Sequence, residues 1–362
     1  MAQKRERLVL KVGTSVLTQK TQQLDYNVIH QIVEQIGALC RAGHEVVLVS
    51  SGAAGASYGL GEFQRERKSL LRKQMMTSVG QPRLMSVYTD FFREYHLTVA
   101  QALLTRSDFG DRERYLNVRD VIEGLLGMGI VPILNENDVI STDALTFGDN
   151  DFLAAAAASL VNASRLFLLT VGEGFYSHGD PRHHPEARLV HEVPEITSEM
   201  WKWCQDSLST GGTGGMLSKL KAADLATSFG IETNIVSGKI ADVVPKVMEG
   251  AKIGTRFLPS ARRVKGYRQW LRIGALTNGR ITIDAGAENA LRQDKSLLPA
   301  GIVKADGDFK SGDVVEIYTE AEERIGVGLV NMSAKEIAGR KAKGRKGERS
   351  DEAIHKDRLL LV

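Results

Sequence analysis

The sequence predicts a mixed α/β protein in which a mainly parallel sheet is sandwiched by helices and followed by a small β-rich domain. Short, near-continuously apolar runs alternate with longer segments of helical spacing, in units of about 30 residues, as in strand–helix–strand proteins. From about residue 256 the pattern changes to short strand-like runs separated by Gly-Asp turns. A chain of 362 residues is also longer than the chains that usually fold around a single hydrophobic core, so we expect two domains.

The first part of the chain carries the predicted parallel sheet. Its strands are near-continuously apolar, as strands covered by helices on both faces should be. We expect these strands at residues 8–12, 45–50, 98–104, 130–134, 166–170 and 233–237. Between the first two strands, an apolar set at helical spacing runs over residues 28–40 and ends before Gly43. Further helices are predicted at residues 69–95, 111–126 and 150–161.

The second part predicts a small β-rich domain. Its strand-like runs lie at residues 280–283, 301–303, 314–317 and 326–330, with Gly-Asp turns at residues 307–308 and 312–313. Residues 256–277 contain Pro259 and scattered basic side chains, which is typical of a connection. We therefore expect a first domain at residues 1–258, a linker at 259–277 and a second domain at 278–362.

Composition excludes several classes of protein. Hydrophobic residues make up 43% and charged residues 25% of the chain, close to globular averages, which argues against disorder, collagen and a coiled coil. The formal net charge of +3 is too small for an obligatory nucleic-acid binder, although residues 335–349 hold seven basic and two acidic side chains. This basic run is expected to be a solvated surface, and it is the place where RNA would bind.

Targeting signals and cysteine usage favour a cytoplasmic protein. Cys40 and Cys204 give no disulfide framework and no metal-binding spacing, which suits a reducing compartment. The N-terminus lacks the apolar region and cleavage site of a signal peptide. The longest near-apolar run, residues 152–161, is half of the ~20 residues that a membrane span needs.

Polar or glycine-rich segments follow most of the predicted strands. They lie at residues 11–15, 50–55, 135–138, 148–151, 170–174 and 211–216, and the last opens a helix that contains Lys219. Since ligands of open α/β sheets bind beyond the carboxyl ends of the strands, these segments predict one shared site. Glycine-rich turns that open helices suit phosphate. No Walker A or G-x-G-x-x-G pattern occurs, so a nucleotide site would be of another kind.

These motifs resemble a known family. The matching segments are Lys-Val-Gly-Thr-Ser at 11–15, Ser-Gly-Ala at 51–53, Gly80-Gln81, residues 101–106, residues 111–117, Asn-Glu-Asn-Asp at 135–138, Gly-Asp-Asn-Asp at 148–151 and residues 212–219. Together they resemble the glutamate 5-kinases (gamma-glutamyl kinases), a branch of the amino acid kinase family, and the C-terminal part resembles a PUA domain. The resemblance covers essentially the whole chain.

The resemblance implies an ATP-dependent kinase that phosphorylates the γ-carboxylate of L-glutamate to give L-glutamyl 5-phosphate, the first step of proline biosynthesis. A carboxylate is ionised at neutral pH, so the reaction needs positioning and charge neutralisation rather than a general base. Lys11 and Lys219 would neutralise the transferring phosphoryl group, and Asp151 would orient these lysines. Asp149 is the candidate ligand for Mg²⁺, the cofactor that accompanies ATP.

By the same resemblance, two further groups of residues bind the substrates. The glutamate-binding group is Ser51, Gly52, Asn135, Asp138 and Asn150. The ATP-binding group is Lys11, Thr170, Val171, Thr213, Gly214, Gly215, Met216, Leu217, Ser218 and Lys219. An acidic residue such as Asp138 suits the α-ammonium group of glutamate, whereas the backbone amides and hydroxyl around Ser51 suit a carboxylate.

The resemblance also implies inhibition by proline near the glutamate site and a homo-oligomer, either a dimer or a tetramer. RNA binding by the PUA-like domain is expected to be dispensable. The chain departs from the family pattern at Val171 and Glu173, where the family has Asp and Lys, and this puts nucleotide recognition in question. The loop at residues 177–182 is one residue longer than usual, and the tail lacks several residues around 344–352.

Each of these residues also has an ordinary structural explanation. A lysine at a strand end or on an amphipathic helix commonly lies at the surface, and Asp149, Asn150 and Asp151 before an alanine-rich helix would cap it well. Two other functions remain open. One is an amino acid kinase for N-acetylglutamate, carbamate or another acid, which Asp138 disfavours because an acylated substrate has no free ammonium. The other is an RNA-associated protein, which the small net charge disfavours.

Overall fold

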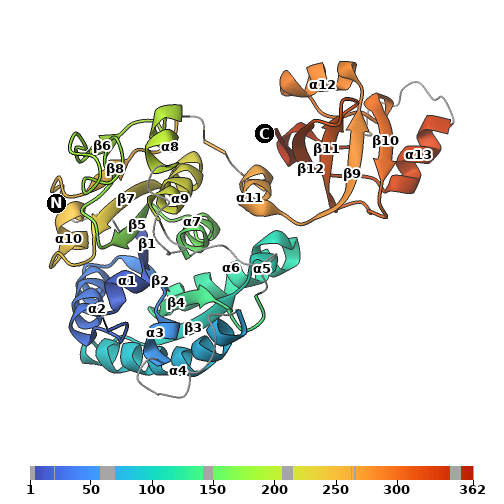
Figure 1. Cartoon of the computed structure of the whole chain (residues 1–362). Coiled ribbons are helices and arrows are strands. Elements are labelled where there is room, and N and C mark those ends of the chain that lie inside the picture. Colours follow the sequence, from blue (N-terminus) through green and yellow to red (C-terminus); the bar gives the residue numbers. More distant parts are fainter. Residues whose placement is uncertain are drawn as a thin grey trace. The chain divides into compact units, whose positions relative to one another are not determined.

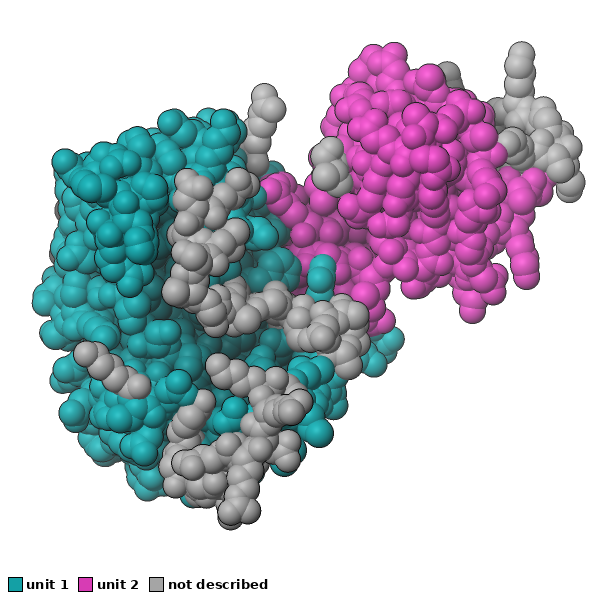
Figure 2. Space-filling view, in the orientation of Figure 1, with its two compact units in different colours: residues 1–108, 113–263 teal, residues 109–112, 264–362 magenta. Residues whose placement is uncertain are grey.

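The chain folds into two compact units, each with its own sheet (Figures 1 and 2). The computed structural model describes residues 5–19, 21–57, 70–141, 150–205, 215–261, 263–264, 266–342 and 352–361. Unit 1 comprises residues 1–108 and 113–263, and unit 2 comprises residues 109–112 and 264–362. No helix in the described part of the chain is long and apolar enough to cross a membrane.

Unit 1 is built on an eight-stranded sheet with the order β3-β4-β2-β1-β5-β7-β8-β6. Its strands are β1 (Arg7–Val12), β2 (Glu45–Ser50), β3 (Val99–Leu104), β4 (Val131–Glu136), β5 (Arg165–Thr170), β6 (Glu192–Val193), β7 (Glu232–Ser237) and β8 (Thr255–Phe257). All neighbours pair in parallel except β7 and β8, which are antiparallel. The prediction of a mainly parallel sheet is therefore confirmed.

Helices cover both faces of this sheet (Figure 1). They are α1 (Thr14–Leu17), α2 (Tyr26–Arg41), α3 (Ala53–Ser57), α4 (Leu70–Glu94), α5 (Arg106–Gly110), α6 (Arg112–Gly127), α7 (Asn150–Leu160), α8 (Ser198–Gln205), α9 (Met216–Ser228) and α10 (Val243–Met248). The five helices predicted from the sequence, including the one that contains Lys219, correspond to α2, α4, α6, α7 and α9. One expectation about burial was wrong: β3 lies at an edge of the sheet as described, where its faces are less fully covered, and Leu103 is 36% exposed.

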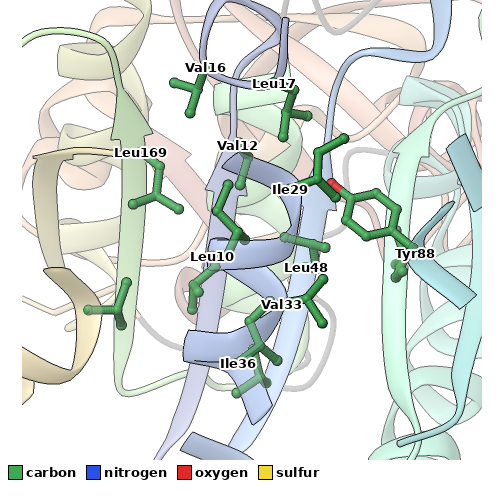
Figure 3. Close-up of a cluster of buried hydrophobic side chains, with 14 of the residues drawn as sticks. Leu10, Val12, Val16, Leu17, Ile29, Val33, Ile36, Leu48, Tyr88 and Leu169 are labelled. Atoms are coloured by element: carbon green, nitrogen blue, oxygen red, sulfur yellow. The ribbon is translucent and has the colours of Figure 1, made fainter. Parts of the chain in front are cut away.

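One face of β1 and β2 forms a hydrophobic cluster with α2 (Figure 3). Side chains of a strand alternate between the two faces of the sheet, so Leu10 and Val12 point to this cluster. Ile29, Val33 and Ile36 recur at helical spacing on α2 and meet them. The same alternation sends Lys11, between Leu10 and Val12, to the opposite face.

On that opposite face, α7 contacts β1, β2, β4 and β5 and also packs against α9. Residues Ala154 to Ala158 of this helix are fully buried. Because alanine side chains are small, the helix axis can lie close to the sheet and to α9. The first turn of α7 is consequently held beside the side chain of Lys11.

A close approach also fixes the position of α4. A Cβ atom at Gly80 would lie 1.7 Å from the carbonyl oxygen of Ala53 in α3, so only glycine fits there. Helix α4 is thereby held against α3, which directly follows the carboxyl end of β2. The same helix carries two side chains that reach the candidate site.

Unit 2 contains a five-stranded sheet with the order β10-β9-β11-β12-β13. Its elements are α11 (Tyr267–Gly274), β9 (Thr277–Ile283), α12 (Ala285–Arg292), β10 (Ile302–Asp306), β11 (Val314–Thr319), β12 (Arg324–Leu329), α13 (Ala334–Ala342) and β13 (Leu359–Leu361). The prediction of a small β-rich part is confirmed, and four of its strands were anticipated. The predicted connection at 259–277 contains a helix, α11, whose Trp270 and Leu271 are buried.

Candidate active site

The carboxyl ends of four neighbouring parallel strands, β1, β2, β4 and β5, meet at one edge of the sheet of unit 1. A cavity of about 310 Å³ lies there. It is lined by Lys11, Gly13, Thr14, Ser15, Val16, Ser51, Gly52, Ala53, Ala54, Lys73, Thr77, Asn135, Glu136, Asp138, Asn150, Leu169, Thr170, Val171 and Lys219. The cavity therefore brings together residues from most of the segments that the sequence predicts to form one site.

An ion triad of Lys11, Asp151 and Lys219 forms the buried centre of the site. The Lys11 ammonium lies 2.5 Å from Asp151 Oδ1, and the Lys219 ammonium lies 3.0 Å from Asp151 Oδ2. The Ser218 hydroxyl donates a further hydrogen bond of 2.8 Å to Oδ2. Lys11 is 3%, Lys219 6% and Asp151 0% exposed. One carboxylate thus ties a strand, β1, to the first turn of α9.

The electrostatics of this triad keep Asp151 ionised. Burial by itself would raise the pKa of the Asp151 carboxyl, but the charges and hydrogen bonds of Lys11 and Lys219 outweigh burial, so the pKa is lowered. A carboxyl group whose pKa is lowered by folding stabilises the folded state at every pH above its ordinary pKa. This stabilisation is lost as the pH falls through the lowered pKa. The triad is therefore intact at neutral pH, with two positive charges and one negative charge.

A chain of side-chain amides lies beside the triad. The Asn150 amide nitrogen donates to Ser51 Oγ at 2.9 Å and to Asn135 Oδ1 at 2.8 Å. The Asn135 amide nitrogen in turn donates to Gln81 Oε1 at 2.9 Å, in the buried interior. Gln81 accepts this bond, so it sets the orientation of the Asn135 amide and, through it, that of Asn150. Ser51 accepts from Asn150 and can direct its own hydroxyl hydrogen towards a ligand oxygen.

The backbone after β2 is held in place by a buried hydroxyl pair. Ser50 Oγ lies 2.8 Å from the hydroxyl of Tyr88, whose pKa burial raises, so Tyr88 is neutral. Ser50 Oγ also donates to the carbonyl oxygen of Ser51 at 2.9 Å. Gly52 follows with a φ of 101°, a conformation that other residues rarely adopt. The sharp turn presents Ser51 and the backbone of Gly52 to the cavity.

At another part of the cavity wall, Asp138 forms an ion pair with Lys73 of α4. The Lys73 ammonium lies 2.9 Å from Asp138 Oδ1. The Asp138 side chain is 14% exposed and that of Lys73 is 54% exposed. This pair is therefore much more accessible to solvent than the triad.

The segments expected to bind a nucleotide are only partly described. Gly215 precedes the first turn of α9, and its carbonyl oxygen lies 2.8 Å from the Ser218 hydroxyl. Met216 and Leu217 are half-buried in the same turn, and Val171 is 50% exposed after β5. Thr213, Gly214 and Asp149 lie outside the described residues, as does most of the tail segment 344–352.

The described residues offer little to a metal ion by themselves. No group of three or more His, Cys, Asp or Glu side chains is placed to bind one within the described ranges. Both oxygens of Asp151 already accept from Lys11, Lys219 and Ser218. Among the described residues, a Mg²⁺ ion would therefore find few protein ligands, and phosphate oxygens and water would make up much of its coordination.

Three residues of α4 at the site were not predicted from the sequence: Lys73, Thr77 and Gln81. Gln81 lies in one of the motifs that carry the resemblance, but no function was predicted for it or for Lys73. A signal existed: Lys73, Thr77 and Gln81 are polar residues spaced four apart within one predicted helix, so they share one face. That face of α4 lines the cavity through Lys73 and Thr77.

Comparisons with known proteins agree with this architecture. Residues 6–237 match the amino acid kinase family, and residues 279–353 match the PUA domain. The chain is 41% identical over 366 residues to a glutamate 5-kinase of Thermoanaerobacter sp. (strain X514), with 98% of both chains covered. It is 43% identical over 366 residues to a glutamate 5-kinase of Moorella thermoacetica, covering 98% of this chain and 96% of that one.

Solved structures show the same fold. A carbamate kinase from Giardia lamblia bound to AMP-PNP superposes with a TM-score of 0.51 at 19% identity, covering 72% of this chain and 100% of that one. An isopentenyl phosphate kinase superposes with a TM-score of 0.50 at 20% identity, covering 69% and 99%. At such low identity the likeness concerns the fold alone.

The triad predicts a large effect of Asp151→Asn on stability. The substitution removes the negative charge that two buried lysines share, and breaking a buried ion pair typically costs about 3–5 kcal/mol. Asp138→Asn is the matched control, because it removes one carboxylate from a solvent-accessible pair and should cost at most about 1 kcal/mol. The free energy of unfolding in urea measures both. Equal losses in the two variants would contradict the view that the triad depends on Asp151.

Proposed function

Because the chain belongs to the amino acid kinase family, in which its full-length relatives are glutamate 5-kinases, we propose that this site transfers the γ-phosphoryl group of ATP to the γ-carboxylate of L-glutamate. The product is L-glutamyl 5-phosphate, and the reaction is the first step of proline biosynthesis. The observation that carries the proposal is the buried Lys11–Asp151–Lys219 triad beside a polar cavity. The triad suits a reaction in which negative charge moves between two anionic groups.

The acceptor needs no general base. The γ-carboxylate of glutamate is ionised at neutral pH and can attack the γ-phosphorus of ATP directly, while the bond from phosphorus to the bridging oxygen of ADP breaks. Two anions must approach each other for this step, so the barrier is lowered by positioning and by charge neutralisation. Both are tasks for fixed cations in a site with little water.

Lys11 and Lys219 supply these cations, and Asp151 holds them. Because Asp151 balances only one of the two lysines, the triad retains one positive charge for the phosphoryl group. Lys11 is anchored on a central strand and Lys219 in the first turn of a helix, so neither side chain has to be ordered during the reaction. Preorganised charge of this kind stabilises a transition state most effectively.

The polar residues of the cavity suit glutamate. Asn150, directly before Asp151, binds Ser51 Oγ and leaves the Ser51 hydroxyl free to donate to a substrate carboxylate. Gly52 and Asn135 complete this wall. Asp138 supplies a negative charge for the α-ammonium group. An N-acetylated substrate has no such cation, so Asp138 favours free glutamate over N-acetylglutamate.

ATP is the phosphoryl donor of this family, and we assign its phosphates to the first turn of α9. Gly215 to Lys219 lie there, where backbone N–H groups are available for anions. Thr170 and Val171 border the cavity from β5, and Thr213 and Gly214 complete the proposed group. Mg²⁺ bound to ATP would neutralise part of the phosphate charge, with Asp149 as its proposed ligand. Since ATP is the donor, we place the reaction in the cytoplasm.

Regulation and assembly complete the proposal. We propose that proline inhibits the enzyme by competing near the glutamate site, and that the enzyme is a homodimer or homotetramer. All described residues of the site belong to unit 1, so RNA binding by the PUA domain should be dispensable for phosphoryl transfer.

An acceptor assay tests the proposed function. The purified chain is incubated with Mg²⁺-ATP, hydroxylamine and either glutamate, N-acetylglutamate or aspartate, and the release of ADP and formation of hydroxamate are measured. We expect hydroxamate with glutamate only, and a lower rate when proline is added. Faster reaction with N-acetylglutamate would indicate an amino acid kinase of different specificity. The RNA-associated alternative would be supported if the chain showed no turnover and bound RNA, and if deleting residues 278–362 abolished that binding.

Lys219→Ala tests the role of the triad in the chemical step. The variant loses one of the two cations that face the transition state, so we expect kcat to fall by roughly 100-fold or more, with little change in KM for glutamate. Lys221→Ala is the control, because Lys221 is an exposed lysine two residues further along the same helix. If both variants keep the kcat of the unmodified enzyme, Lys219 has no part in catalysis.

Gln81→Met tests the amide chain. Without the acceptor oxygen, the Asn135 amide nitrogen loses its buried partner, while the Glu136 backbone N–H still binds Asn135 Oδ1, so the chain that positions Asn150 and Ser51 is weakened. We expect KM for glutamate to rise roughly 10-fold, the worth of one buried hydrogen bond, while KM for ATP stays within about 2-fold. Gln35→Met is the matched control: Gln35 is 3% exposed and accepts from the Val244 backbone. A parallel rise in both KM values would point to general damage instead.

A further inference from the structure

The substrate proposed above poses a recognition problem. At neutral pH the α-carbon of L-glutamate carries an ammonium group and a carboxylate side by side. Asp138 suits the ammonium group, but the α-carboxylate next to it would then lie close to the Asp138 carboxylate and be repelled by it. A site that accepts the whole zwitterion therefore needs a cation beside Asp138.

Lys73 is that cation. Its ammonium group lies 2.9 Å from Asp138 Oδ1, and both residues line the cavity. The Lys73 side chain is 54% exposed, so it can move by the few ångströms that a new partner requires. Lys73 lies in the first turn of α4, and the close contact between Gly80 and Ala53 fixes this helix against α3.

The other lysines of the cavity are committed elsewhere. Among the described residues that line it, the cations are Lys11, Lys73 and Lys219. Lys11 and Lys219 both bind Asp151 in the buried triad. The two parts of the cavity thus differ: in the triad two lysines share one carboxylate, which suits phosphate, whereas the Lys73–Asp138 pair offers one group of each sign, which suits a zwitterion, and Glu136 adds a carboxylate to the cavity wall.

We propose that Lys73 is a specificity-determining residue that binds the α-carboxylate of glutamate while Asp138 binds its α-ammonium group. This inference rests on the proposed function. In the free enzyme the two side chains neutralise each other, and on binding, one ion pair is exchanged for two. The exchange loses little, because the Lys73 side of the existing pair is 54% exposed and solvent weakens its attraction to Asp138.

A different role for Lys73 would have the opposite effect. If Lys73 only occupied Asp138 and competed with the substrate ammonium, its removal would make glutamate bind more tightly. If Lys73 instead carries the α-carboxylate, its removal weakens binding. The sign of the change in KM therefore separates the two roles.

The first experiment compares Lys73→Met with the unmodified full-length enzyme in the hydroxamate assay. We expect KM for glutamate to rise roughly 10-fold or more, with kcat and KM for ATP within about 2-fold. Arg93→Met is the matched control, because Arg93 lies on the same helix and pairs with Asp90 at 3.2 Å, away from the residues that line the cavity. An unchanged or lower KM for glutamate in Lys73→Met overturns the proposal.

The second experiment removes the charge from the substrate instead of the enzyme. The α-amide of L-glutamate keeps the γ-carboxylate and the α-ammonium group but has a neutral carboxamide in place of the α-carboxylate. The unmodified enzyme should prefer glutamate to this amide by roughly 10-fold or more in kcat/KM, and Lys73→Met should reduce the preference to about 3-fold or less. An undiminished preference in Lys73→Met means that Lys73 does not contact the α-carboxylate and overturns the proposal.

Failure of this inference is distinct from failure of the proposed function. If the unmodified enzyme does not phosphorylate glutamate at all, the proposed function fails. If the unmodified enzyme is active and Lys73→Met behaves like it, only the role of Lys73 fails.

Discussion

The buried ion triad of Lys11, Asp151 and Lys219 is the interaction on which the rest of the structure depends. Three charged groups with exposures of 6% or less are tolerated only if each keeps its partner, because an unpaired charge in the interior is very unfavourable. The three elements that carry them, β1, α7 and α9, must therefore stay at fixed separations. The parallel sheet and the packing of α7 against α9 provide this rigidity.

The cavity contains two different electrostatic environments. The dry triad holds cations in place for the moment when negative charge moves between donor and acceptor. The wetter Lys73–Asp138 pair, by contrast, can open, since solvent screens its attraction. Between them, Asn150, Ser51 and Asn135 form neutral hydrogen bonds whose direction is set from Gln81. The residues proposed for phosphoryl transfer are thus held rigidly, whereas those proposed to bind the α-carbon groups of glutamate can move, and the two sets do not overlap.

Most of the central fold was predictable because burial on both faces leaves a clear apolar run, as in β1 and β2. The short strands β6, β8 and β13 were missed, since two or three residues show no period and pair with distant segments. The loops that follow strands predicted which residues meet at the site. Lys73 and Gln81 were not predicted, because their partners Asp138 and Asn135 are distant in sequence, and only the packing of α4 brings them together.

The alanine run of α7 has a consequence for how this protein can evolve. Residues 154–158 are not among the residues that line the cavity, yet their volume sets the spacing between the helix and the sheet, and hence the position of Asp151 relative to both lysines. One added methyl group in a tightly packed interior displaces its neighbours. Drift in this helix is therefore restricted by catalytic fitness as well as by folding, and neutral variation should accumulate on the outer helices instead.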